Sequence, residues 1–216
     1  MAVYTAIFGG YDRLWHAPAH PDVDFVCFTD DPSLEAPPWR VVESEARFEH
    51  PRMSAKWFKA LPQLALPDHR YTIWLDGSVK IRSDAFAEQV MQPLGESGIA
   101  MLRHPDRDNI FGEAEHSLRM SRYSSQPIRE QVEHYKDEGF TSDNDLFWCG
   151  LIVRDNQNER VRELNEAWMR ENERWSYQDQ LSMPYLLWKL GITPAVIPLA
   201  LRENDLFRRI GHRTPD

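Results

Sequence analysis

Apolar residues recur along this chain in short runs, each about as long as one β-strand and each followed by polar or turn-forming residues. These runs occupy residues 3–8, 25–29, 39–42, 71–75, 99–102, 146–153 and 195–199. The run Tyr71-Thr-Ile-Trp-Leu75 is the clearest, because it is uninterrupted and rich in β-branched and aromatic side chains. A continuous apolar run is typical of a strand covered on both faces, as in an open parallel sheet.

Between these runs, apolar positions recur with the spacing of an α-helix. The pattern predicts helices over residues 54–61, 84–91, 113–138 with a break at 124–127, 158–174 and 178–190. We expect Ser54 to cap the first helix and Pro184 to distort the first half of the last one. Strands alternating with helices predict an α/β fold with a mixed, mostly parallel sheet flanked by helices. The sequence contains no internal repeats or linkers, so residues 1–216 are predicted to form a single domain.

Four of the predicted strands end on polar residues that could bind a ligand or take part in catalysis. These segments are residues 9–12, 29–31, 76–78 and 103–107. In an open α/β sheet, ligands bind outside the carboxyl ends of the strands. We therefore expect the four segments to share one edge of the sheet and to form the active site there.

Composition and charge exclude several classes of protein. Hydrophobic residues make up 42% of the chain and charged residues 27%, which is typical of a globular domain. The formal charge of −9 argues against a broad nucleic-acid-binding face, which would need a cationic surface. No segment approaches the roughly 20 apolar residues that span a bilayer. The sequence also lacks the motifs of dinucleotide oxidoreductases, P-loop enzymes, zincin proteases and α/β-hydrolases.

The two cysteines and the first residues of the chain indicate a cellular location. Cys27 and Cys149 lie far apart in predicted strands and form no CxxC pair, so we expect buried, reduced thiols. Residues 1–8 lack the cationic start and the long apolar run of a secretion signal. We therefore expect a cytoplasmic protein.

Asp76 is the leading candidate for chemistry. A carboxylate at the end of a buried strand can face a diphosphate through Mg²⁺ or Mn²⁺, because these hard cations prefer oxygen ligands. The structural alternative is a turn in which the aspartate accepts bonds from local backbone amides. We predict Asp76 as a metal ligand, with His212 as a later ligand. Lys56 and Lys59, about one turn apart on a predicted helix, would face phosphate or form a solvated surface.

The segment after the first strand is a candidate for nucleoside binding. Its two glycines would let the backbone approach a nucleotide closely while Tyr11 stacks on the base, or they would form an ordinary tight turn. Asp30 would accept a hydrogen bond from the nucleoside or cap a turn. The predicted nucleotide-sugar-binding residues are Phe8, Gly9, Gly10, Tyr11, Asp12, Asp30, Lys56, Lys59, Asp76, Gly77 and Ser78.

Two further segments are candidates for binding the sugar and the acceptor. Residues 103–107 gather two guanidinium groups and an imidazole at a strand end, which suits phosphate, sugar hydroxyls or an acidic sugar. Asp179 would either face the sugar or only complement the dipole of its helix. The predicted sugar- or acceptor-binding residues are Arg103, His104, Arg107, Gly150, Gln178 and Gln180, and the predicted catalytic residues are Asp76 and Asp179.

Several of these segments also occur together, in one order, in a known family. They are Thr5-Ala-Ile-Phe-Gly-Gly-Tyr-Asp12, Cys27-Phe-Thr-Asp30, Ser54-Ala-Lys-Trp-Phe-Lys59, Tyr71-Thr-Ile-Trp-Leu-Asp-Gly-Ser78, Arg103-His-Pro105, Cys149-Gly-Leu-Ile-Val-Arg154 and Tyr177-Gln-Asp-Gln180. Over roughly residues 3–190 the chain resembles a glycosyltransferase-like family first catalogued as a domain of unknown function. That family includes bacterial proteins and plant Golgi enzymes linked to pectin and mucilage.

The resemblance implies a GT-A fold, in which a Rossmann-like sheet binds a nucleotide sugar. In such folds an Asp-x-Asp motif usually holds a divalent metal, Mn²⁺ or Mg²⁺. Asp76 matches the first acidic position of that motif, whereas Ser78 occupies the second, so the chain departs from the standard pair. Asp179 corresponds to a carboxylate near the donor sugar in related transferases.

The residues and the resemblance together predict a glycosyltransferase of the hexosyl- or uronosyltransferase class, active in polysaccharide biosynthesis. Its donor would be a nucleoside diphosphate sugar, with UDP as the nucleotide, and its acceptor a hydroxyl group of a glycan or lipid-linked molecule. Asp76 with the metal, aided by Lys56, would neutralise the diphosphate. Asp179 would orient the sugar, stabilise positive charge on it or act as the base. Two alternatives stay open: a protein of this fold that binds nucleotide or glycan without turnover, and a nucleotidyltransferase.

Overall fold

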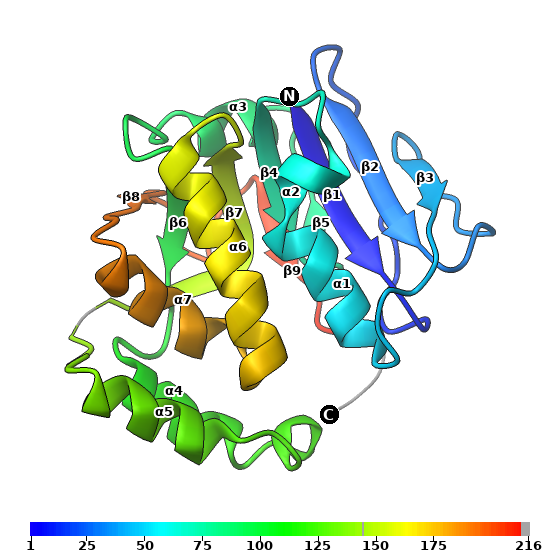
Figure 1. The fold of residues 1–216 in the computed structure, drawn as a ribbon. Coiled ribbons are helices and arrows are strands. Elements are labelled where there is room, and N and C mark those ends of the chain that lie inside the picture. Colours follow the sequence, from blue (N-terminus) through cyan, green and yellow to red (C-terminus); the bar gives the residue numbers. More distant parts are fainter. Residues whose placement is uncertain (144, 213–216) are drawn as a thin grey trace.

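A seven-stranded sheet forms the centre of the computed structural model, which describes residues 1–143 and 145–212 (Figure 1). In spatial order its strands are β3 (Arg40–Glu43), β2 (Asp24–Thr29), β1 (Ala2–Ile7), β4 (Tyr71–Leu75), β7 (Phe147–Asp155), β6 (Ile99–Arg103) and β8 (Ala195–Val196). Strands β1 to β4 are parallel, and β7 runs antiparallel to both β4 and β6. The sheet is mixed and mostly parallel, as the alternation of strands and helices predicts.

Helices cover both faces of this sheet, which explains why its strands are apolar throughout. Every residue of β1 is buried, as are all residues of β7 except the last. Helices α1 (Pro51–Ala60), α6 (Glu159–Arg174) and α7 (Asp179–Lys189) pack on one face, beside the short α2 (Pro62–Ala65) (Figure 1). The other face carries α3 (Phe86–Met91) and a two-stranded sheet of β5 (Val79–Ile81) and β9 (Phe207–Arg209). One hydrophobic cluster packs on each face of this sheet. Because both clusters share the same strands, the fold is a single domain.

A second group of helices lies beyond the carboxyl ends of the strands (Figure 1). It consists of α4 (Ile110–Ser117), the 3₁₀ turn η1 (Ser121–Tyr123) and α5 (Ile128–Asp137). Helix α4 packs against α5 and α7, so this group forms a wall facing the ends of the central strands. Among the described residues, no helix is both long and apolar enough to cross a bilayer.

Two local predictions were wrong, and each error has a physical reason. Helix α1 begins at Pro51 rather than Ser54, and His50 caps it by accepting a hydrogen bond from the amide of Arg52 at 3.2 Å. Proline at the first helical position loses no internal bond, which favours this earlier start. Helix α7 runs through Pro184 without a break, because buried residues surround that proline on the helix. The cysteine prediction is confirmed, since both thiols are free and buried.

Candidate functional site

A cavity of about 270 Å³ opens where the ends of β1, β4 and β6 meet helices α1, α4 and α7. These strands point the same way, so their carboxyl ends share one edge, as expected. Most of the predicted site residues line this cavity: Phe8, Tyr11, Asp12, Lys56, Lys59, Asp76, Gly77, Ser78, His104, Arg107, Gln178, Asp179, Gln180 and His212.

The segment after β2 does not reach the cavity, in contrast to the prediction. Asp30 is exposed, and its carboxylate accepts hydrogen bonds from the amide of Gly9 at 2.9 and 3.1 Å. Gly9 and Gly10 have φ values of +61° and +63°, the left-handed region that glycine adopts without strain. These residues therefore form the tight turn that was the alternative interpretation, with Asp30 closing it.

Two other predicted residues also lie outside the cavity lining. A Cβ atom on Gly150 would lie 2.2 Å from Cζ2 of Trp148. The close approach to this glycine is therefore made by the indole of Trp148, which lines the cavity itself. Arg103 is exposed, and its guanidinium lies 4.6 Å from the centre of the Phe147 ring.

Two lysines and two aspartates form a cluster at the wall of the cavity. The Lys59 ammonium lies 3.0 Å from Asp76 Oδ1 and 2.6 Å from Asp179 Oδ2, and Lys56 also donates to Asp179 Oδ2. The lysines come from α1, Asp76 directly follows β4 and Asp179 begins α7. The indole of Trp74 donates a further bond to Asp76 Oδ1 at 2.7 Å. The cluster thus joins three elements by two positive and two negative charges, of which Lys59 and Asp179 are buried.

The charges in this cluster shift one another's proton affinities. Burial alone would raise the pKa of Asp76, but Lys59, Lys56 and the indole bond lower that pKa to about 2. Burial would lower the pKa of Lys59, yet Asp179 and Asp76 outweigh it and raise that pKa. Burial lowers the pKa of Lys56, and the attraction of Asp179 only partly offsets this effect. At neutral pH, Asp76 and Lys59 are therefore held in their charged forms.

Asp179 presents an oxygen that the protein leaves unused. Its side chain is 5% exposed, and both ammonium groups bind Oδ2. Within the described part of the chain, the buried Oδ1 atom has no hydrogen-bond partner. A buried acceptor without a hydrogen bond lowers the stability of the fold, unless a ligand donates a hydrogen bond to it. Asp179 lines the cavity, so a ligand there that reaches Oδ1 would complete this acceptor.

The residues predicted as metal ligands do not form a metal site. Asp76 Oδ1 already accepts bonds from Lys59 and Trp74, and His212 Nδ1 lies 3.0 Å from Asp12 rather than joining Asp76. Nowhere in residues 1–143 and 145–212 do three or more histidine, cysteine, aspartate or glutamate side chains gather to hold a metal ion. The donor set therefore does not fit the divalent metal that a GT-A fold implies.

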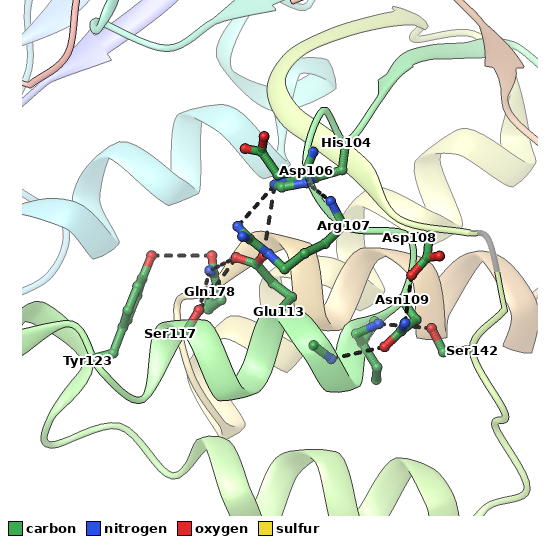
Figure 2. A network of polar contacts seen from close by, with 12 residues as sticks. His104, Asp106, Arg107, Asp108, Asn109, Glu113, Ser117, Tyr123, Ser142 and Gln178 are labelled. Carbon is green, nitrogen blue, oxygen red and sulfur yellow. Dashed lines mark hydrogen bonds and ion pairs between the residues drawn. The ribbon is translucent and has the colours of Figure 1, made fainter.

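A network of polar contacts fixes the opposite wall of the cavity (Figure 2). The buried Glu113 of α4 binds Arg107 through Oε2 and accepts a hydrogen bond from the amide of Gln178 at 2.8 Å. That amide also donates to Ser117, while Tyr123 donates to its oxygen. Gln178 immediately precedes α7, so the network sets the position where Asp179 begins that helix.

The end of the cavity near β1 holds a cluster of rings and cations. The Arg52 guanidinium lies 4.2 Å from the centre of the Tyr11 ring and donates to the Tyr11 hydroxyl. The His212 ring lies 5.0 Å from the Tyr11 ring on a tilted plane. Arg52 thus occupies a face of the Tyr11 ring that was predicted to stack on a base.

Sequence reasoning missed several residues of the lining. Glu113 lies in a polar helix, and nothing in the sequence distinguishes it from the exposed Glu115 on the same helix. Trp74 could have been predicted as a site residue, because it lies in the clearest strand, two residues before Asp76. Other lining residues that the predictions did not include are Arg122, Tyr123, Trp148 and Arg209.

Comparison with known proteins places this arrangement in a family. A family model described as TOD1/MUCI70, glycosyltransferase-like domain, matches residues 1–212. The chain belongs to this family. A curated protein named probable hexosyltransferase MUCI70, from Arabidopsis thaliana, is 30% identical to this TOD1/MUCI70 domain over 107 residues. That match covers 48% of this chain and only 18% of the plant protein.

A solved structure shares the fold of this TOD1/MUCI70 domain. A structure described as the apo form of the bifunctional glycosyltransferase WbbM matches with a TM-score of 0.52 and 12% identity. The match covers 90% of this chain and 37% of that chain. Mouse xyloside xylosyltransferase 1 matches with a TM-score of 0.47 and 12% identity, over 88% of this chain and 81% of that chain. The first likeness confirms the GT-A fold class, and the family match confirms the resemblance seen in the sequence.

Proposed function

We propose that this domain is a glycosyltransferase that moves a sugar from a nucleoside diphosphate sugar to a hydroxyl group of a glycan or lipid-linked acceptor, with UDP as the nucleotide. The observation that carries the proposal is the cluster of Lys56, Lys59, Asp76 and Asp179 at the strand-end cavity of a GT-A fold. The family match supports the same reaction class, as does the plant relative's name, probable hexosyltransferase.

The charges that line the cavity favour an anionic donor. Six of its lining side chains are lysine or arginine and five are aspartate or glutamate, although the whole chain carries a formal charge of −9. Local cations raise the concentration of an anionic ligand in a cleft. The cavity therefore has one more cationic than anionic side chain on an otherwise acidic protein, which supports binding of a diphosphate there.

In the proposed reaction, the bond between the sugar's anomeric carbon and the diphosphate oxygen breaks, and the electron pair leaves with the diphosphate. The acceptor's hydroxyl oxygen forms the new bond to that carbon, and its proton is released with the diphosphate. Lys56 and Lys59 supply positive charge beside the departing group. This differential stabilisation lowers the barrier, because the negative charge grows as the bond breaks.

Asp179 has an orienting and electrostatic role in this mechanism. Its buried Oδ1 atom accepts a sugar hydroxyl or faces positive charge that develops on the anomeric carbon. Two ammonium groups bind Oδ2, so Oδ1 is the oxygen left to contact the sugar. We assign Asp179 to positioning and charge stabilisation.

A product assay on the purified chain tests this proposal. The protein is incubated with UDP-glucose, UDP-galactose and UDP-galacturonate, with a panel of oligosaccharide acceptors, and nucleotides are separated by anion-exchange chromatography. The proposal predicts release of UDP from at least one donor and loss of that release in Asp179→Asn. The exposed Asp137→Asn, a matched substitution on α5, is expected to behave as wild type.

The remaining outcomes of this assay would contradict the proposal. Release of pyrophosphate when UTP and a sugar 1-phosphate replace the UDP-sugar would identify a nucleotidyltransferase. Calorimetric binding of UDP without release from any donor would identify a binding protein of the same fold. A cytoplasmic location remains a prediction, which fractionation of cells that express the full protein would test.

A further inference from the structure

We propose that the Lys56–Lys59 pair, rather than a divalent metal, neutralises the diphosphate at Asp76, so that nucleotide binding in this cavity needs no metal ion. The inference rests on the proposed function, since it concerns how the same donor is held. Three features of the site lead to it: a carboxylate already paired with a lysine, an incomplete set of oxygen ligands and a lysine that can change partners.

The carboxylate that a metal would use first already binds a cation. Lys59 Nζ lies 3.0 Å from Asp76 Oδ1 and is only 3% exposed, while the Trp74 indole donates to the same oxygen at 2.7 Å. Because Lys59 and Trp74 both bind Oδ1, a divalent ion would approach Asp76, which is 28% exposed, through Oδ2. There it would lie close to the Lys59 ammonium, and like charges repel. Asp179 holds the ammonium from the other side at 2.6 Å, so Lys59 cannot easily leave.

The remaining ligands that a divalent ion requires are absent from the described site. Ser78 stands at the second position of the acidic motif and is 2% exposed. Asp12 lies beside Gly77, but its carboxylate pairs with His212 at 3.0 and 3.2 Å. Magnesium and manganese favour several oxygen ligands, including one or two carboxylates beside the phosphates. Asp76 would have to supply this carboxylate alone, with an Oδ1 atom that Lys59 and Trp74 already bind.

Lys56 is placed to contact the diphosphate directly. Its side chain is 16% exposed at the cavity, in contrast to the fully shielded Lys59. Both lysines donate to the same oxygen of Asp179, so Asp179 keeps a cationic partner when Lys56 turns to a phosphate oxygen. Arg52, on the same helix, lines the cavity and adds positive charge near its nucleoside end. In this way the chain's own cations supply the charge that a metal would otherwise bring.

Two titrations on the intact chain test the inference. The first is calorimetry with UDP in EDTA and in Mn²⁺, for which we expect dissociation constants that agree within about threefold. In Lys56→Gln we expect binding at least about tenfold weaker in both buffers, whereas Lys56→Arg keeps metal-free binding because it keeps the charge. Lys136→Gln is the matched control, since its side chain is 50% exposed on α5, away from the cavity. The second titration follows free Mn²⁺ by electron paramagnetic resonance, and we expect no stoichiometric binding to wild type with or without UDP.

The outcomes separate this inference from the function on which it rests. UDP binding that appears only with Mn²⁺, or one Mn²⁺ bound per chain, would overturn the inference and leave the glycosyltransferase proposal intact. A lack of UDP binding in both buffers would overturn the assignment of a UDP-sugar donor and, with it, this inference. The comparison of the two buffers uses wild-type protein, so it stays decisive if the Lys56 variants fail to fold.

Discussion

The ammonium of Lys59 lies 2.6 Å from Asp179 Oδ2, and the two side chains are 3% and 5% exposed. This pair connects α1 to the first residue of α7, across the ends of the central strands. A buried charge is tolerated only when it is paired and hydrogen-bonded. The contact therefore fixes two elements of the site relative to one another as well as supplying charge.

Removing this cation should destabilise the fold. Lys59→Met leaves Asp76 without its ammonium partner and Asp179 with Lys56 alone. Breaking a buried ion pair by removing one partner costs about 3–5 kcal/mol, and we expect a loss of this size in urea unfolding. Lys136→Met, on the exposed face of α5, should change the unfolding free energy by less than about 0.5 kcal/mol. Equal stability of Lys59→Met and wild type would contradict the buried cluster.

Neutralising Asp179 should affect turnover more than nucleotide binding. Asp179→Asn keeps the shape of the side chain but removes the negative charge beside the donor sugar. We expect release of UDP from the donor to fall about 100-fold or more, which is typical for loss of one electrostatic contact in a transition state. We expect UDP to bind at least as tightly, because Lys56 and Lys59 lose a competing anion. Weaker UDP binding with unchanged turnover would refute this role.

Glu113 should act through the residues that it positions. Glu113→Gln removes the charged partner of Arg107 and alters the contact with Gln178. We expect a loss of about 2 kcal/mol in unfolding free energy, the range for a bond to a charged group. We also expect KM to rise more than kcat falls, since Glu113 holds binding groups in place. Glu115→Gln, an exposed substitution on the same helix, is the control. An equal effect of this substitution would contradict the positioning role of Glu113.

His104 should make stability depend on pH in acid solution. Burial, followed by the charge of Arg107, lowers the pKa of His104 from 6.5 to about 4. Its Nδ1 atom accepts bonds from the amides of Asp106 and Arg107, which require an unprotonated ring, and Glu113 lies 3.8 Å from Nε2. The unfolded chain takes up the proton first, so this contribution is complete above pH 6.5 and is lost as the pH falls towards 4.

Urea unfolding at pH 7 and pH 5 checks this dependence. The wild type should lose on the order of 1 kcal/mol at pH 5 through His104, beyond what His104→Asn loses. The exposed His16→Asn variant should keep the wild-type dependence. An identical pH profile in all three proteins would show that His104 does not titrate below its ordinary range.

The sequence predicted the sheet well because its strands are buried on both faces. The strand 71–75 was predicted with the bounds that β4 has, and the ends of β1, β4 and β6 were expected at the edge where they meet. Strands β5 and β9 were missed, because each has three residues and they pair across more than a hundred positions. Short strands of this kind are specified by tertiary contacts rather than by local pattern.

The chemistry of the site was predicted less completely than its location. Lys59 was expected to face phosphate or solvent, whereas it is buried between Asp76 and Asp179. That environment is made by residues 17 and 120 positions away, so no local pattern reveals it. Asp30 was expected at a nucleoside or in a turn, and in the structure its carboxylate closes the turn at Gly9. Turn-forming aspartates have the same sequence signature as ligand-binding ones.

The crystal structure of the UDP complex, grown without divalent metal, tests the central claim most directly. The account predicts UDP in the cavity, with a diphosphate oxygen within hydrogen-bond distance of Lys56 Nζ and with the Lys59–Asp76 contact intact. UDP bound at another surface, or a cavity that stays empty at saturating UDP, would contradict it.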